Sequence, residues 1–196
     1  MSRQIGTITA FVGPMFSGKS EALLARLKRA SYAKKKVLVV KPKKDLRTAD
    51  EIVSRRLQEE EKKFQKYSSM PAHTINDASE LTALVESSGC QVIGVDEGQF
   101  FPEWFVDAIK QLAWEKGIDV IVSGVDIDAW RRPFGIMPQL VAVADKVHKL
   151  NAICFKCGNE ARFTQKLSGS QEQVEIGDAD KYEARCGECY VEFQGQ

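Results

Sequence analysis

Short apolar runs alternate with amphipathic stretches along the first 124 residues of the chain. Buried strands are predicted at four clusters of apolar and β-branched residues, which lie at 5–12, 36–41, 91–95 and 119–123. Helices, marked by leucines at helical spacing or by capping signals, are predicted over 21–33, 76–87 and 102–116. Because strands that alternate with helices form sheets covered on both faces, this order predicts an α/β fold around a mostly parallel sheet.

Two stretches of the chain depart from this pattern. Residues 51–66 are densely charged and favour a solvated helix or a mobile insertion over a binding surface. After Leu150 the apolar runs stop, and cysteines, glycines and charged residues take over. We therefore expect a domain boundary near Asn151, with an α/β domain at 1–150 and a smaller unit at 151–196.

The composition is that of a folded protein with a near-neutral charge. The chain has 196 residues, 43% of them hydrophobic, and 28 Lys plus Arg balance 27 Asp plus Glu, which gives a net charge of +1. A dedicated nucleic-acid-binding protein usually carries a basic excess, so this balance argues against one. No apolar run approaches the roughly 18 residues of a transmembrane helix, and residues 1–4 lack the pattern of a secretory signal. We expect a cytosolic protein with neither a membrane nor a nucleic-acid partner.

The turn after the first predicted strand matches the phosphate-binding pattern G-x-x-x-x-G-K-[S/T] at every fixed position. Its residues are Gly13, Pro14, Met15, Phe16, Ser17, Gly18, Lys19 and Ser20. In such a loop backbone N–H groups converge on an anion, the lysine reaches the β- and γ-phosphates, and the hydroxyl binds Mg²⁺. A buried strand before the loop and a helix after it supply the context that this mechanism needs, so we expect an ATP-binding P-loop here.

The third predicted strand ends in two carboxylates, Asp96 and Glu97. Ligands of open α/β sheets bind at the carboxyl ends of the strands. Asp96 fits the acid that helps to hold Mg²⁺ in P-loop enzymes, whereas Glu97 would face the substrate and accept a proton from an attacking hydroxyl. These residues alone do not separate a kinase from an ATPase, because Glu97 suits a water nucleophile equally well. Phe100 and Phe101 follow, and they suit either a base-binding pocket or core packing.

Two C-x-x-C pairs stand in the C-terminal unit, Cys154 with Cys157 and Cys186 with Cys189. Two such knuckles form a tetrahedral thiolate site suited to Zn²⁺, and four thiolates leave no open coordination position, so this zinc would be structural. Disulfides or redox chemistry are the alternatives, which a reducing cytosol disfavours. Residues 158–185, between the pairs, would form a loop held at both ends, as many binding loops are. Cys90 has no partner at metal spacing and is expected to be a passive thiol.

Taken together, these motifs resemble those of the type II thymidine kinases, the zinc-containing cellular type. Beside the P-loop and the cysteine quartet, the matching pieces are Asp96-Glu97-Gly98-Gln99-Phe100, Pro133-Phe134-Gly135 and Asp180-Lys181-Tyr182, in the family's order. The resemblance implies a P-loop NTPase-like (RecA-like) sheet flanked by helices, with a small zinc-binding domain that carries a lasso loop. It also implies transfer of the γ-phosphoryl group of ATP·Mg²⁺ to the 5′-hydroxyl of thymidine, with Glu97 as the general base. A homotetramer and feedback inhibition by dTTP are further implications.

The resemblance assigns residues to each ligand. ATP would be bound by residues 13–20 together with Asp45, Arg47, Asp96 and Gln99. Magnesium would be bound by Ser20 and Asp96. Thymidine would be bound by Met15, Phe100, Phe134, Thr164 and Tyr182, and by the lasso loop, whose residues are Gln173, Val174, Glu175, Ile176 and Gly177. The backbone of the lasso loop would close over the thymine.

One position departs from the family pattern and leaves the substrate range open. Ala129 stands where the family usually has an aromatic residue, and Trp130 follows it, so either the indole replaces that ring or the pocket is looser. A kinase of another pyrimidine deoxynucleoside, such as deoxyuridine or deoxycytidine, is therefore an alternative. A zinc-ribbon nucleic-acid-dependent ATPase and a catalytically silent nucleotide-binding scaffold are two others, although the short chain and the lack of a basic excess weigh against the ATPase.

Overall fold

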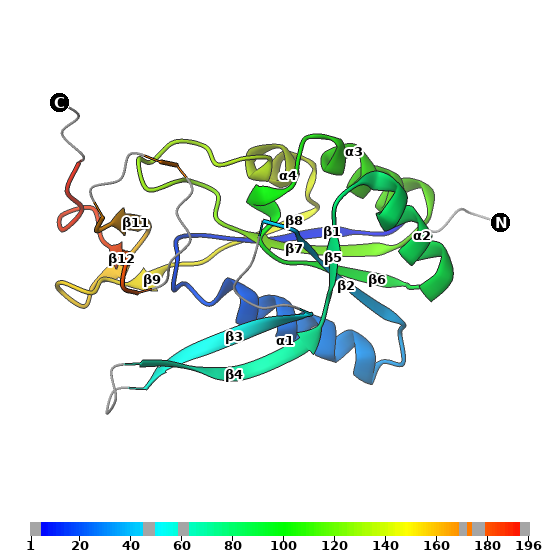
Figure 1. The fold of residues 1–196 in the computed structure, drawn as a ribbon, viewed down its shortest axis with the longest axis horizontal. Coiled ribbons are helices and arrows are strands. Elements are labelled where there is room, and N and C mark those ends of the chain that lie inside the picture. Colours follow the sequence, from blue (N-terminus) through cyan, green and yellow to red (C-terminus); the bar gives the residue numbers. More distant parts are fainter. Residues whose placement is uncertain (1–4, 45–49, 59–62, 169–171, 174–178, 193–196) are drawn as a thin grey trace.

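The computed structural model describes residues 5–44, 50–58, 63–168, 172–173 and 179–192 (Figure 1). In this part of the chain six parallel strands form a central sheet, in the order β5-β2-β6-β7-β1-β8. Their bounds are β1 (Ile8–Val12), β2 (Val37–Pro42), β5 (His73–Ile75), β6 (Val92–Val95), β7 (Asp119–Gly124) and β8 (Lys146–Lys149). The predicted α/β fold with a mostly parallel sheet is confirmed, and β1, β2, β6 and β7 are the strands that the sequence predicts.

Helices connect the strands and cover both faces of the sheet (Figure 1). They are α1 (Lys19–Tyr32), α2 (Ala78–Ser88), α3 (Trp104–Lys110) and α4 (Met137–Val143), with a 3₁₀ turn η1 (Gly98–Phe100) and a π-helical turn η2 (Gln111–Glu115). The single helix predicted over 102–116 is thus divided, because its α-helical turns widen at Gln111. Among the described residues, no helix is long and apolar enough to cross a membrane.

The hydrophobic core has two layers, one on each face of the sheet. On β2, Leu38 and Val40 belong to the layer under α2, α3 and α4, whereas Val39 belongs to the layer under α1. This alternation follows from the period of two along a strand, and it explains why every residue of β1 is buried. Since both faces are covered, the carboxyl edge of the sheet, where β1 and β6 end, is the place left for ligands.

The described residues of the charged stretch belong to two paired antiparallel strands, so the helical alternative for 51–66 is wrong. Strand β3 (Glu51–Gln58) pairs with β4 (Lys63–Pro71) in antiparallel register, and the register shifts after Ser54. This pair of strands lies against α1, where Ile52 is buried in the core and Lys28 Nζ donates to Ser68 Oγ at 2.5 Å. Charged residues have a high intrinsic helix propensity, but pairing between the two strands and burial of Ile52 override it here.

The last part of the chain forms a small unit beyond the carboxyl ends of β1 and β7 (Figure 1). Its described residues make two antiparallel pairs of strands: β9 (Ala152–Ile153) with β10 (Glu160–Ala161), and β11 (Phe163–Lys166) with β12 (Tyr182–Arg185). A core of small residues, Ala152, Ala161 and Ala184, packs with Cys154 and Cys186. The division into domains at 150/151 stays a prediction, but the change of character after Leu150 coincides with the end of the central sheet.

Candidate active site and metal centre

The glycine-rich loop lies between β1 and α1, at the carboxyl edge of the sheet. Gly13 has φ 147°, and a Cβ on it would lie 2.2 Å from the carbonyl oxygen of Leu150, so no side chain fits there. Gly18 has φ 79° and precedes the first residue of α1. The backbone therefore curls between strand and helix, which points the start of α1 and its positive dipole end at the loop.

Two polar side chains of the loop, Lys19 and Ser17, donate hydrogen bonds to the loop's own backbone. Lys19 Nζ donates to the carbonyl oxygen of Pro14 at 2.6 Å and lies 3.4 Å from Ser17 Oγ. Ser17 Oγ donates to the same carbonyl at 2.8 Å. The ammonium group of Lys19 is thus held inside the concave side of the loop, where the phosphates of a nucleotide would meet it.

Asp96 joins the loop to two strands of the sheet. Its carboxylate is buried, and Oδ1 accepts hydrogen bonds from Ser20 Oγ at 3.3 Å, from the Glu97 N–H at 3.1 Å, and from Ser123 Oγ at the end of β7. A hydroxyl and a carboxylate are the hard oxygen ligands that Mg²⁺ prefers. The pair Ser20 and Asp96 therefore fits the Mg²⁺ of a nucleotide site.

Glu97 leaves the strand through a left-handed turn. Strand β6 ends at Val95, and Glu97 has φ 53°, a conformation that costs a non-glycine residue about 1 kcal/mol or more and is concentrated at functional sites. Its Oε2 accepts a hydrogen bond from Gln99 Nε2 at 2.5 Å. Gln99 is itself buried, and its Oε1 accepts from the Val125 N–H at 3.0 Å. Gln99, which the resemblance assigns to ATP, thus contacts Glu97, a contact that no sequence motif indicates.

The aromatic residues after Glu97 divide between the site and the core. Phe101 is buried and stacks on Phe105 with the ring centroids 3.8 Å apart, so core packing is the correct interpretation for it. Phe100 instead meets the edge of Phe134, with centroids 5.7 Å apart. The turn that carries Phe134 packs closely against the backbone of Gln99. A Cβ on Gly135 would lie 2.0 Å from the Gln99 carbonyl oxygen. Phe100 and Phe134 therefore lie together beside the residues that hold Glu97.

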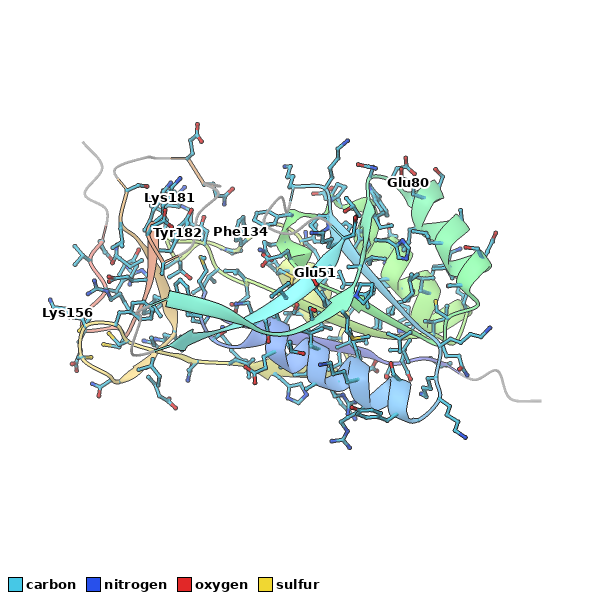
Figure 2. All side chains as sticks on the ribbon, turned by 60° about the horizontal axis from the view of Figure 1, so that its bottom comes forward. Glu51, Glu80, Phe134, Lys156, Lys181 and Tyr182 are labelled. Carbon is cyan, nitrogen blue, oxygen red and sulfur yellow. The ribbon has the colours of Figure 1, made fainter. Side chains whose placement is uncertain are left out.

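The C-terminal unit contacts the phosphate loop directly. The backbone N–H of Met15 donates to Oγ1 of the buried Thr164 at 3.0 Å, and Phe16 packs against Phe155 with ring centroids 5.3 Å apart. Tyr182 on β12 is also buried, and Figure 2 shows it on this unit and Phe134 on the segment between β7 and α4. The structure thus places Thr164 against Met15, two residues that the resemblance assigns to the nucleoside.

Several predicted site residues lie outside the described residues: Asp45, Arg47, Val174, Glu175, Ile176 and Gly177. Of the lasso loop only Gln173 is described, and its Nε2 donates to Asp128 Oδ2 at 2.8 Å. Ala129 is buried, and its carbonyl oxygen accepts a hydrogen bond from the hydroxyl of Tyr190 at 2.6 Å. Asp128 and Tyr190, which connect these segments, were not recognised in the sequence because their partners lie 45 and 61 residues away.

The predicted metal centre is assembled by the two cysteine knuckles. The sulfur atoms of all four cysteines, Cys154, Cys157, Cys186 and Cys189, lie within 4.8 Å of one another, and those of Cys157 and Cys186 are 3.6 Å apart. A tetrahedral Zn²⁺ with Zn–S bonds of about 2.3 Å separates its sulfurs by about 3.8 Å. The cluster therefore fits a structural zinc ion, whereas Cys90 is buried elsewhere, and burial raises the pKa of its thiol.

The ionisation of these thiols also favours a bound cation. Burial raises the pKa of Cys154, but N–H groups of Cys186, Cys157 and Lys156 stabilise its thiolate and bring the pKa down to about 6. Cys189 shows the opposite shift, because a hydrogen bond with Cys157, burial and the other neighbouring thiols raise its pKa to about 12. Sulfurs this close repel one another as thiolates. A divalent metal at their centre would remove that conflict and allow all four to ionise.

Comparison with known proteins shows which family the chain belongs to. Residues 6–190 match the family model described as thymidine kinase. A thymidine kinase of Bacteroides thetaiotaomicron is 39% identical over an alignment that covers 100% of this chain and 92% of that protein. Thymidine kinases of Mycoplasma mobile (40% identity, 97% of this chain, 90% of that protein) and Mesomycoplasma hyopneumoniae (42% identity, 94% of this chain, 95% of that protein) are also similar. This chain therefore belongs to the thymidine kinase family.

Proposed function

We propose that this protein is an ATP-dependent thymidine kinase, which transfers the γ-phosphoryl group of ATP to the 5′-hydroxyl of thymidine and yields dTMP for DNA synthesis by nucleoside salvage. The observation that carries the proposal is the contact between the phosphate loop and the end of β6, where Ser20 Oγ and Asp96 Oδ1 are 3.3 Å apart. Glu97 follows Asp96 directly. A nucleotide site and a carboxylate base are therefore neighbours at one edge of the sheet.

The phosphate loop would bind and orient ATP. Backbone N–H groups of residues 16–20 and the dipole of α1 suit the β- and γ-phosphates, and Lys19 supplies a positive charge to the transferring group. Ser20 and Asp96 would hold Mg²⁺, which neutralises charge on the phosphate oxygens when it is bound. The resemblance adds Asp45 and Arg47 to this site. Little covalent work is asked of the protein, so positioning and electrostatics supply most of the rate enhancement.

Glu97 would act as the general base. The 5′-hydroxyl of thymidine attacks the γ-phosphorus as its proton passes to a carboxylate oxygen of Glu97, and the bond from that phosphorus to the β,γ-bridging oxygen breaks to release ADP. The hydrogen bond from Gln99 Nε2 to Oε2 supports the direction of that carboxylate. Gln99 is a positioning residue in this scheme, since it touches Glu97 and the backbone of Val125.

The nucleoside would lie between the segment after β7 and the C-terminal unit. Phe100 and Phe134 support this placement because they pack together beside Glu97, and Thr164 supports it because it contacts Met15 of the phosphate loop. The resemblance adds Tyr182 and the lasso residues Gln173, Val174, Glu175, Ile176 and Gly177. In this scheme the zinc ion has a structural role, since it holds both ends of the chain segment that contains the lasso.

Transfer of labelled phosphate from ATP to a panel of nucleosides tests the proposal. We expect dTMP to form, with thymidine among the best of the four deoxynucleosides and deoxyuridine as the control for the 5-methyl group. A preference for deoxyuridine or deoxycytidine would overturn the proposed specificity for thymidine, whereas the proposed nucleoside kinase activity would stand. ATP hydrolysis that single-stranded DNA stimulates, with no nucleoside monophosphate formed, would favour the nucleic-acid-dependent ATPase instead.

The resemblance supports three further parts of the proposal. They are a homotetramer, feedback inhibition by dTTP, and a cytoplasmic location. Light scattering on the purified protein would give the mass of the assembly, and a mass below four chains would contradict the tetramer. Added dTTP is expected to raise the apparent KM for thymidine. Fractionation of cells would test the location.

A further inference from the structure

Asp128 is a buried carboxylate to which neither the motifs nor the proposed mechanism gives a role. It lies on the segment between β7 and α4 and is 3% exposed. Its Oδ1 accepts from the N–H groups of Trp130 and Arg132, both at 2.9 Å, and its own N–H donates to the Arg132 carbonyl at 2.8 Å. One oxygen of the carboxylate is therefore used to close a tight turn over residues 128–132.

The second oxygen of Asp128 reaches a different part of the chain. Oδ2 accepts a hydrogen bond from Gln173 Nε2 at 2.8 Å, across 45 residues of sequence. The residue before Gln173 is also tied down, because Lys166 Nζ donates to the Glu172 carbonyl at 2.8 Å and Lys166 is itself 3% exposed. Residues 172–173 are thus fixed by two side chains, one from β11 and one from the segment after β7.

Other contacts also hold the turn against the C-terminal unit. The hydroxyl of Tyr190 donates to the Ala129 carbonyl at 2.6 Å, and the guanidinium of Arg131 lies over the Tyr190 ring, 4.8 Å from its centroid. Arg131 also pairs with Glu192. None of these contacts involves Asp128 Oδ2, so a variant that removes one of them leaves the bond to Gln173 in place.

The same turn leads directly to the aromatic residue assigned to the nucleoside. Ile127 and Pro133 form a β-bridge across it, and the Phe134 N–H donates to the Asp126 carbonyl at 3.0 Å. Phe134 in turn packs against Phe100. A rigid turn therefore has Asp128 within it and Phe134 directly after it.

We propose that Asp128 is a positioning residue for the nucleoside, which holds Gln173 at a fixed distance from Phe134 through the bond between its Oδ2 and Gln173 Nε2. The inference rests on the proposed function, because Gln173 and Phe134 are nucleoside residues only in that scheme. Two backbone N–H groups and one side-chain amide donate to the oxygens of this buried carboxylate, so its hydrogen-bonding capacity is used. Gln173 supplies such a donor without a charge of its own.

Two variants test the proposal. Gln173→Glu places a second carboxylate beside Asp128, and the added Asp128→Asn removes the resulting repulsion. In Gln173→Glu two carboxylates would face each other, and we expect the KM for thymidine to rise about ten- to a hundredfold, with the KM for ATP within about twofold of wild type. In the double variant Asp128→Asn with Gln173→Glu, the Asn Oδ1 still accepts from Trp130 and Arg132 and its Nδ2 donates to the new carboxylate. We expect this double variant to recover most of the lost affinity.

A matched control separates positioning from a general loosening of the turn. Tyr190→Phe removes a different hydrogen bond between the turn and the C-terminal unit, and its KM for thymidine should stay within about twofold of wild type. Unfolding temperatures of all variants would show that each is folded. A KM for thymidine that is unchanged in Gln173→Glu, or not recovered in the double variant, would overturn the role of Asp128.

The same assay distinguishes this inference from the proposed function. If the wild-type protein phosphorylates thymidine and the variants have the same KM for thymidine as wild type, only the role of Asp128 is overturned. If the wild-type protein prefers another deoxynucleoside, the proposed specificity for thymidine is overturned. The KM values of the variants are then compared with that nucleoside as the substrate. Wild-type protein that phosphorylates no nucleoside overturns both.

Discussion

Gln99 joins Glu97 to the end of β7 through the two ends of one amide group. Its Nε2 donates to Glu97 Oε2 at 2.5 Å, and its Oε1 accepts from the Val125 N–H at 3.0 Å. Glu97 sits at φ 53° on this turn, and its backbone N–H donates to Asp96 Oδ1 at 3.1 Å. The direction of its carboxylate therefore depends on a residue two positions along the chain.

Gln99→Met should misdirect Glu97 without removing it. Methionine has a similar volume but neither donates to Glu97 nor accepts from Val125, so we expect kcat to fall by up to about a hundredfold with a small change in the KM for ATP. Steady-state kinetics with thymidine and ATP varied in turn would measure both. If kcat is unchanged in a variant that is folded, the orienting role of Gln99 is wrong.

Glu97→Gln should abolish turnover and leave nucleotide binding nearly intact. The amide cannot take the proton of the 5′-hydroxyl, and loss of a general base typically costs about a hundred- to ten-thousandfold in rate. Calorimetric titration with a non-hydrolysable ATP analogue gives the binding control, since Lys19 and Ser20 are untouched. Turnover close to that of wild type would remove Glu97 from the mechanism.

Loss of any one zinc ligand should release the metal and destabilise the C-terminal unit. In Cys157→Ser the remaining sulfurs cannot complete a tetrahedral site, so we expect the zinc content of the purified protein to drop and its unfolding temperature to fall. Cys90→Ser is the matched control, because Cys90 is buried in the main core away from the cluster. Equal zinc content in the two variants would argue against the metal centre.

Asp119 should make stability depend on pH at the acidic end. Burial raises the pKa of its carboxyl, but hydrogen bonds from Lys35 and Thr7 outweigh burial and hold that pKa below its ordinary value. A carboxyl of this kind stabilises the fold above its unfolded pKa, and the stabilisation is lost as the pH falls through the folded pKa. Asp119→Asn should therefore lower the unfolding temperature at neutral pH, with a difference from wild type that shrinks below about pH 4.

Thermal unfolding over a series of pH values would check this effect. Asp107→Asn is the control, because the side chain of Asp107 is 80% exposed and forms an ion pair with Lys110 at the surface. That variant should unfold close to the temperature of wild type throughout. A loss of stability in Asp119→Asn that is the same at pH 3 and pH 7 would show that the contact, and not the charge, matters.

Local signals in the sequence were enough to predict the frame of the site. The strand, glycine-rich loop and helix at residues 8–32 follow one another directly, and so do β6 and the two carboxylates. The cysteine spacing was likewise sufficient to predict the cluster that the structure shows. The loop and the carboxylates are made by residues adjacent in sequence to the strands that position them. The paired C-x-x-C spacing is one that a zinc site requires.

Features that depend on distant partners were missed. The charged stretch at 51–66 has the propensity of a helix, and its strands exist because they pair with each other and cover α1. Strand β8 was not predicted because all its residues are exposed and show no apolar pattern. The contacts of Asp128 with Gln173 and of Tyr190 with Ala129 likewise join segments that no local pattern connects. The roles of Asp45, Arg47 and residues 174–177 stay predictions.

The hydrogen bond from the Met15 N–H to Thr164 Oγ1 makes the phosphate loop depend on a strand of the metal-binding unit. Phe16 of the same loop packs against the small core that contains Cys154 and Cys186. Removal of a metal ion from the cysteine cluster is therefore expected to weaken ATP binding as well as the stability of the C-terminal unit.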